Sequence, residues 1–190
     1  MLTPSNANLT YDIGEAVANG GPGALNVGAG AAFPTWAGTV LDEAATVVLV
    51  LDSPADLWPV TWDLLRIGYD TPAGWLAGGM MAWRTAAMDI ERLPQITVHE
   101  LKRRLDAGTL DLLDVRQPLE LIVESVPGAK DIPLPELRSR LNELPKDREI
   151  LVICRSAQRA YYATRILLQN GFKARVLSGG TLSRTLFLAA

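Results

Sequence analysis

The second half of the chain alternates short apolar runs with amphipathic stretches, and this alternation predicts its fold. The runs DLLDV (111–115) and EILVI (149–153) have the length and aliphatic content of buried strands. Between them, Leu137, Leu141 and Leu144 are spaced as on one face of a helix, and a second helical pattern follows residue 154. Strands that alternate with helices across short loops predict an α/β fold, with a mainly parallel sheet covered by helices on both faces.

Three segments of the first half recur, in the same order, roughly 100 residues later. The matched pairs are PGALNV with PGAKDI, TVVLVLD with EILVIC, and LLRIGYDTPAGWLAGG with LLQNGFKARVLSGG. Ordered self-similarity of this kind indicates two copies of one folding unit. We therefore predict two domains, 1–92 and 95–190, which meet at the polar, proline-containing segment ERLPQ.

The single cysteine, Cys154, follows the apolar run 149–153 and precedes a helical pattern. In α/β proteins the loop at the carboxyl end of a strand is where ligands bind. The N–H groups of such a loop, the helix N-terminus and the cations Arg155 and Arg159 are expected to hold an anion and to favour the thiolate of Cys154. This environment suits nucleophilic attack on a sulfane sulfur and its storage as a persulfide. The alternative interpretation is an inert core cysteine.

Several motifs resemble those of the rhodanese family of sulfurtransferases. They are LLDVRQP, VPGAKDIPL, CRSAQR and NGFKARVLSGG in the second half, with PGALN and GGMMAW in the first. The second copy is most similar to the rhodanese modules attached to coenzyme A disulfide reductases. The tandem arrangement resembles the rhodanese pairs that follow a metallo-β-lactamase-like persulfide dioxygenase domain. The resemblance implies two rhodanese-like domains and a sulfurtransferase that uses thiosulfate or a persulfide.

The resemblance also assigns roles to individual residues. Cys154 becomes the persulfide-forming nucleophile, and Asp114 and Arg116 become supporting residues. The substrate-binding cradle comprises Arg155, Ser156, Ala157, Gln158 and Arg159. This six-residue loop suits sulfur, whereas related phosphatases resemble it with one extra residue that makes room for phosphate.

Two other functions remain open at this stage. In the first, the chain is a binding or sensing module whose Cys154 is oxidised or persulfidated without turnover. In the second, which the loop length disfavours, it is a phosphatase.

The first copy departs from the family pattern. Asp52 aligns with the catalytic cysteine, and Gly14 stands where the resemblance expects an arginine, so this copy is predicted to be non-catalytic. Its tryptophans are expected to pack in the core or between the copies: Trp58, Trp62, Trp75 and Trp83. At the end of the second copy, three residues are expected to close the core: Leu182, Leu186 and Phe187.

Composition narrows the possible partners. The net charge of −3 argues against nucleic acid, since phosphate binding needs clustered cations. One cysteine and one histidine, His99, cannot form a disulfide or a zinc site, and His99 is expected on the surface. We predict no cofactor, no membrane contact and a cytoplasmic location. The expected partners are a small sulfur-donor anion, a thiol acceptor and a protein such as a persulfide dioxygenase.

Overall fold

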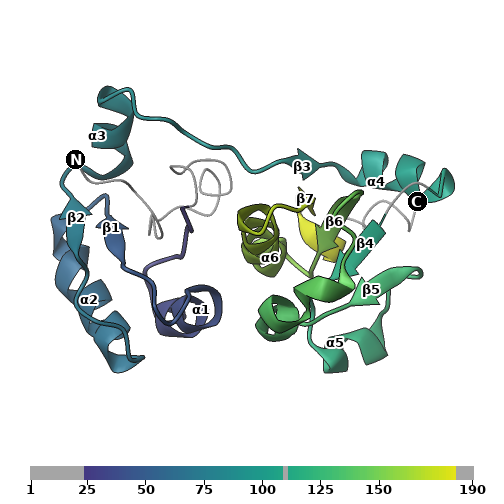
Figure 1. Ribbon diagram of the computed structural model, residues 1–190, viewed down its shortest axis with the longest axis horizontal. Helices are drawn as coiled ribbons and strands as arrows, with labels where there is room; N and C mark the ends of the chain where they lie inside the picture. Colours follow the sequence, from purple (N-terminus) through teal and green to yellow (C-terminus); the bar gives the residue numbers. More distant parts are fainter. Residues whose placement is uncertain (1–23, 109–110, 183–190) are drawn as a thin grey trace. The chain divides into compact units, whose positions relative to one another are not determined.

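The computed structural model describes residues 24–108 and 111–182, coloured in Figure 1. The chain divides into two compact units, Met1–Arg92 and Leu93–Ala190, which we call unit 1 and unit 2. The predicted features at Gly14, Leu186 and Phe187 lie outside the described residues. Within the described part of the chain, none of the helices has the length and apolar character needed to cross a membrane.

Unit 2 contains a five-stranded parallel sheet in the order β3-β7-β6-β4-β5 (Figure 1). Its strands are β3 (Gln95–Ile96), β4 (Asp111–Asp114), β5 (Ala129–Asp131), β6 (Glu149–Ile153) and β7 (Lys173–Leu177). The order places β4 directly beside β6, with Asp114 in register with Ile153. Asp114 and Cys154 therefore lie at the same carboxyl edge of the sheet, as the α/β prediction requires.

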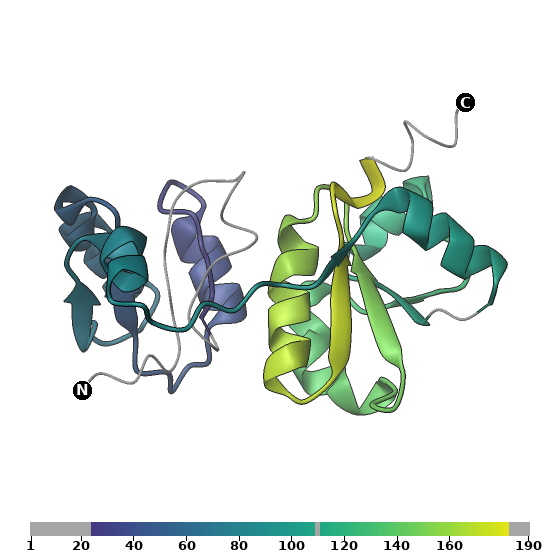
Figure 2. The same ribbon diagram turned by 90° about the horizontal axis from the view of Figure 1, so that it is seen from above.

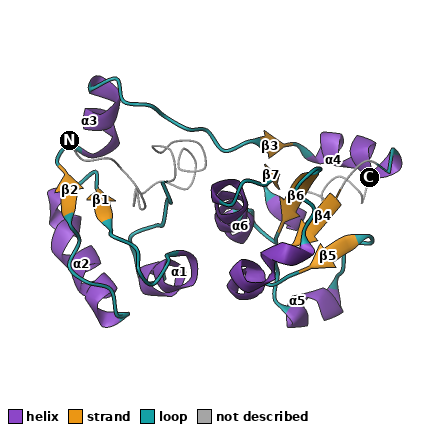
Figure 3. Ribbon diagram, in the orientation of Figure 1, coloured by secondary structure: helices purple, strands orange, loops and turns teal. Residues whose placement is uncertain are grey.

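Helices cover both faces of this sheet (Figures 2 and 3). They are α4 (Val98–Asp106), α5 (Pro118–Val123), the 3₁₀ segment η2 (Leu134–Glu143) and α6 (Gln158–Gln169). On one face, Leu101 of α4 joins a buried cluster that includes Leu112 of β4 and Leu151 of β6. On the other face, α6 packs against β6, β7 and η2. Burial on both faces explains why β6, the middle strand of the sheet, is continuously apolar from Ile150 to Ile153.

The ends of the helices follow local sequence signals, with one exception. As the Thr-x-x-Glu spacing predicts, the Glu100 N–H donates to Thr97 Oγ1 at 3.3 Å, which caps α4. The predicted helix over 135–144 is instead the 3₁₀ segment η2, interrupted at Arg140 (φ −114°, ψ 15°). Pro135 lacks an N–H donor, and Ser139 Oγ donates to Glu136 O at 2.9 Å, a local bond that competes with regular helix pairing.

The described part of unit 1, residues 24–92, contains six short elements. Its elements are α1 (Phe33–Val40), β1 (Val48–Val50), η1 (Pro54–Asp56), α2 (Leu57–Arg66), β2 (Gly74–Leu76) and α3 (Gly79–Thr85). Among the described residues, β1 and β2 form a two-stranded parallel sheet rather than a large one. Pro59 lies in the first turn of α2, where its missing N–H leaves no helical bond unmade.

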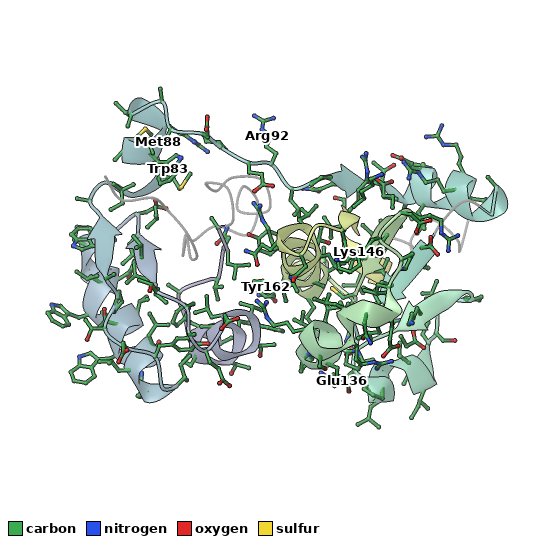
Figure 4. All side chains as sticks on the ribbon, viewed as in Figure 1. Trp83, Met88, Arg92, Glu136, Lys146 and Tyr162 are labelled. Carbon is green, nitrogen blue, oxygen red and sulfur yellow. The ribbon has the colours of Figure 1, made fainter. Side chains whose placement is uncertain are left out.

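The predicted packing role of the tryptophans holds for only part of the set. Trp83, labelled in Figure 4, is buried and its indole N–H donates to Asp89 O at 3.0 Å. Trp58 and Trp62 are 67% and 59% exposed, so neither packs in the core of unit 1, and packing between the copies stays a prediction. The buried stripe of α2 runs through Val60 and Leu64, and the two tryptophans are offset from it by two residues on the helix.

The strand register gives an alignment of unit 1 that differs from the sequence-based alignment at Asp52. β1 pairs with β2 as β6 pairs with β7, and each pair is followed by Gly-Gly. If Gly79 is matched with Gly180, the register aligns Leu51, and not Asp52, with Cys154. A Cβ at Gly79 would lie 2.8 Å from Leu51 O, and one at Gly180 would lie 2.4 Å from Cys154 O. The aligned position in unit 1 therefore carries an aliphatic side chain and no thiol.

Candidate active site

Cys154 lies directly after the buried strand β6, in the loop that leads to α6 (Figure 3). The residue is fully buried. Its sulfur accepts a hydrogen bond from the backbone N–H of Ala160, with 3.3 Å between N and Sγ. The loop turns into the helix at Ala157, which adopts the left-handed conformation (φ 73°, ψ −16°). The sulfur thus sits beneath the first turn of α6, where the helix dipole favours negative charge.

The backbone of the loop is arranged as an anion-binding nest. Across the described residues, the N–H groups of Arg155, Ser156, Ala157, Gln158 and Arg159 have no acceptor in the protein. Consecutive N–H groups without acceptors, next to a helix N-terminus, bind anions. The five residues of the predicted cradle thus lie in the loop after β6 and the first turn of α6.

The segment after β7, residues 180–182, contacts the carbonyl groups of this loop and fixes its position. Thr181 N–H donates to Cys154 O at 2.8 Å, and Leu182 N–H donates to Arg155 O at 3.1 Å. Gly180 lies so close that a Cβ there would be 2.4 Å from Cys154 O and 2.5 Å from Arg155 O. Because N–H and C=O point in opposite directions in a trans peptide, these contacts turn the next two N–H groups away from the tail.

The contacts of this segment correct the prediction for Leu182. Its backbone follows the cysteine loop, and its side chain is 49% exposed instead of closing the core.

Arg159, at the start of α6, forms a two-point ion pair with Glu120 of α5. Its Nη1 and Nη2 donate to Glu120 Oε2 and Oε1 at 2.5 and 2.7 Å. Glu120 Oε2 also accepts from the Gln117 N–H at 2.9 Å, which completes the cap of α5. The hydrogen bonds from Arg159 lower the pKa of Glu120 to about 2, against the opposing effect of its partial burial. The pair ties the end of the cradle to α5.

Asp114 and Arg116 form a buried ion pair beneath the same edge of the sheet. Arg116 Nη2 donates to Asp114 Oδ2 at 2.7 Å, and Nε lies within 3.0 Å of both carboxylate oxygens. Arg116 Nη2 also donates to Glu124 O at 3.0 Å, directly after the end of α5. The side-chain bond to Asp114 raises the pKa of Arg116. Both side chains are committed to each other, so they support the site without facing a ligand.

Two residues of the site were missed by sequence reasoning. Glu120 was not singled out, although Gln117-x-x-Glu120 is a capping-box spacing and a cradle arginine needs an acidic partner. Gly180 belongs to the repeated Gly-Gly segment, but a single sequence does not show that this glycine lies against the cysteine loop. Gln158, in contrast, was predicted to bind substrate, while its side chain hydrogen-bonds to Tyr162, labelled in Figure 4.

Fold and site define unit 2 as an α/β domain with a buried cysteine at the carboxyl edge of a parallel sheet. A sequence profile of the rhodanese-like domain matches residues 97–183. A sulfurtransferase of Allochromatium vinosum is 36% identical over 92 residues, which cover 47% of this chain and 85% of that protein. A putative sulfurtransferase of Bacillus subtilis, YtwF, is 30% identical over 92 residues, covering 48% of this chain and 89% of that protein. The chain belongs to the rhodanese family.

Two further proteins are similar to this chain. The putative sulfur carrier protein YrkF of Bacillus subtilis is 38% identical over 82 residues, which are 43% of this chain. This chain spans only 44% of the length of YrkF. Among solved structures, reduced Bacillus anthracis CoADR-RHD matches with 36% identity and a TM-score of 0.49, covering 51% of this chain and 17% of that one.

Proposed function

We propose that the chain is a sulfurtransferase that carries sulfane sulfur on Cys154. One observation carries the proposal: the buried sulfur of Cys154 lies beside a nest of five N–H groups that have no acceptor among the described residues. Such a nest would hold the outer sulfur of a persulfide anion, Cys–S–S⁻. Relatives named as sulfurtransferases support the same reading.

The proposed reaction has two displacement steps with thiosulfate as the donor. The thiolate of Cys154 attacks the sulfane sulfur, a bond from Sγ to that sulfur forms, and the sulfur–sulfur bond of thiosulfate breaks. Its electron pair leaves with sulfite. An acceptor thiolate then attacks the outer sulfur of the persulfide, takes that sulfur and releases the Cys154 thiolate. In both steps the nest stabilises the negative charge on the transferred sulfur.

We also propose that unit 1 is a degenerate, non-catalytic rhodanese-like domain. The parallel pair β1–β2 followed by Gly78-Gly79 matches β6–β7 followed by Gly179-Gly180, and this supports the proposal. The position aligned with Cys154 is Leu51, which cannot form a persulfide. On this proposal all sulfur carried by the chain resides in unit 2.

Intact mass after incubation with excess thiosulfate tests the proposal directly. The wild-type chain should gain one sulfur, about 32 Da, which cyanide removes as thiocyanate, because the persulfide is an electrophile at its outer sulfur. The Cys154→Ser variant is the matched control and should gain nothing, since the chain has one cysteine. No gain on the wild type, or sulfur loading without repeated sulfite release in the presence of a thiol, would contradict turnover. The second result would identify the non-turnover sensing module.

A further inference from the structure

The cradle holds fewer free positive charges than its sequence suggests. Three arginines lie near Cys154, and Arg116 is neutralised by Asp114. Arg159, the arginine at the end of the loop, is neutralised by Glu120 through two short hydrogen bonds. Arg155 is exposed and forms no ion pair within the described part of the chain. Among the described residues, Arg155, which follows Cys154 in the chain, is therefore the one of these three arginines whose charge is not offset.

Glu120 holds the guanidinium of Arg159 in a well-oriented ion pair. The guanidinium and carboxylate meet in the two-point geometry that is strongest for this pair, and the side chains are 18% and 31% exposed. The third contact of Glu120, from the Gln117 N–H, fixes the carboxylate on α5. The side-chain hydrogen bond to Glu120 raises the pKa of Arg159, and the nearby Cys154 and Asp114 raise it further. Glu120 thus lies where it offsets the charge that a bound donor anion would meet.

We infer that Glu120 is a specificity-determining residue, which sets the side-chain charge of the cradle to one and so selects sulfane-sulfur donors with a single negative charge over dianions. The inference rests on the proposed function. With the Cys154 thiolate included, the side-chain charges of Arg155, Arg159, Glu120 and Cys154 sum to zero. A second negative charge on the donor then meets no second cation, although the N–H nest remains the same for both donors.

Two donors of matched chemistry separate charge from reactivity. Thiosulfate is a dianion, and methanethiosulfonate is a monoanion that transfers the same sulfane sulfur and releases methanesulfinate in place of sulfite. The measured quantity is the ratio of kcat/KM for thiosulfate to kcat/KM for methanethiosulfonate. In Glu120→Gln this ratio should rise about tenfold, mainly through a lower KM for thiosulfate, which corresponds to about 1.4 kcal/mol.

Variants that remove one or both charges of the Glu120–Arg159 pair show whether neutralisation of Arg159 by Glu120 causes the donor selectivity. Arg159→Gln leaves Glu120 unpaired, so the ratio should fall. The double variant Glu120→Gln/Arg159→Gln restores the wild-type charge and should restore the wild-type ratio within about twofold, as expected for coupled residues. Glu143→Gln is the matched control, since it removes the same charge from an ion pair with Arg140 at the end of η2. Its ratio should equal that of the wild type.

Two outcomes would overturn the inference. One is an unchanged ratio of kcat/KM values in Glu120→Gln. The other is a double variant whose ratio falls as it does in Arg159→Gln, because Arg159 would then contact the donor directly. If Glu120→Gln does not fold, Arg155→Gln takes its place: the ratio should drop about tenfold, because this change removes the free cation. An unchanged ratio there would also overturn the inference.

A second measurement keeps the inference separate from the proposed function. If the wild type turns over neither donor, the proposed function fails, but the charge of the cradle is still measurable by alkylation of Cys154. Iodoacetate is an anion and iodoacetamide is neutral, so the ratio of their rate constants reports local charge. Glu120→Gln should raise this ratio, and the double variant should restore it. An unchanged ratio in Glu120→Gln would overturn the inference.

Discussion

The replacement of Asp114 by asparagine should destabilise unit 2 severely. The side chains of Asp114 and Arg116 are 0% and 4% exposed, and three N–H contacts of 2.7–3.0 Å join them. Asparagine keeps the size of the side chain and removes its charge, so a buried guanidinium is left uncompensated. Breaking a buried pair in this way costs about 3–5 kcal/mol. With a slope of about 1.5 kcal/mol per molar urea, the unfolding midpoint should fall by about 2–3 M.

The chain carries its own pair of reporters for this experiment. Its five tryptophans all lie in unit 1, and its one cysteine is buried in unit 2. In one urea titration, tryptophan fluorescence follows unit 1, and the change of the Cys154 alkylation rate from its folded-state to its unfolded-state value follows unit 2. Asp114→Asn should move the alkylation transition and leave the fluorescence transition in place. The double variant Asp114→Leu/Arg116→Met should regain most of the loss, because an apolar pair needs no charge compensation.

Two results would refute this reasoning. A shift of the alkylation midpoint of less than about 0.5 M would mean that the pair is solvated or that Arg116 finds another acceptor. An equal shift of the fluorescence midpoint would mean that the two units unfold together and that the loss is not confined to unit 2.

Two further predictions concern the cysteine loop. Gly180→Ala places a Cβ against the carbonyls of Cys154 and Arg155 and should slow persulfide formation at least about tenfold by displacing the nest, as intact mass over time will show. Gly171→Ala is its control, with a similar positive φ and open space around the Cβ, and an equal loss of rate there would contradict the steric argument. Acid should also weaken unit 2: the folded pKa of Glu120, about 2, lies below its usual 4.5, so the stability that the Arg159 pair contributes is full above pH 4.5 and is lost as pH falls toward 2. The urea midpoint, measured by circular dichroism, should therefore fall less between pH 4.5 and 2 in Glu120→Gln than in the wild type. Parallel pH dependences of the two midpoints would contradict this prediction.

The sequence predicts the parts of unit 2 that depend on local or periodic signals. The run 149–153 is strand β6, Cys154 follows it directly, and Thr97 caps α4 at the predicted residue. The helical pattern after residue 154 is α6, and its Tyr161 and Tyr162 are both buried. These features follow from spacing along the chain, which one sequence contains in full.

What the sequence could not predict depends on contacts between distant segments. Glu120 meets Arg159 across 39 residues, and Gly180 meets Cys154 across a helix and a strand. The exposure of Trp58 depends on which stripe of α2 the neighbouring elements bury. Composition shows that a residue is apolar or charged, but the partner that satisfies it is fixed by the strand order and the packing of the helices.

The conformation of Ala157 indicates that the cradle loses its conformational entropy during folding and not when an anion binds. A non-glycine residue at φ 73° costs about 1 kcal/mol relative to its usual conformation, and it narrows the range of shapes open to the loop. A glycine at this position would adopt the turn without strain, but the loop would be more flexible before an anion binds. With alanine, the ordering of the N–H groups is completed during folding. A sulfur anion that enters the nest therefore meets a preorganised receptor and keeps more of its binding free energy for the transfer itself.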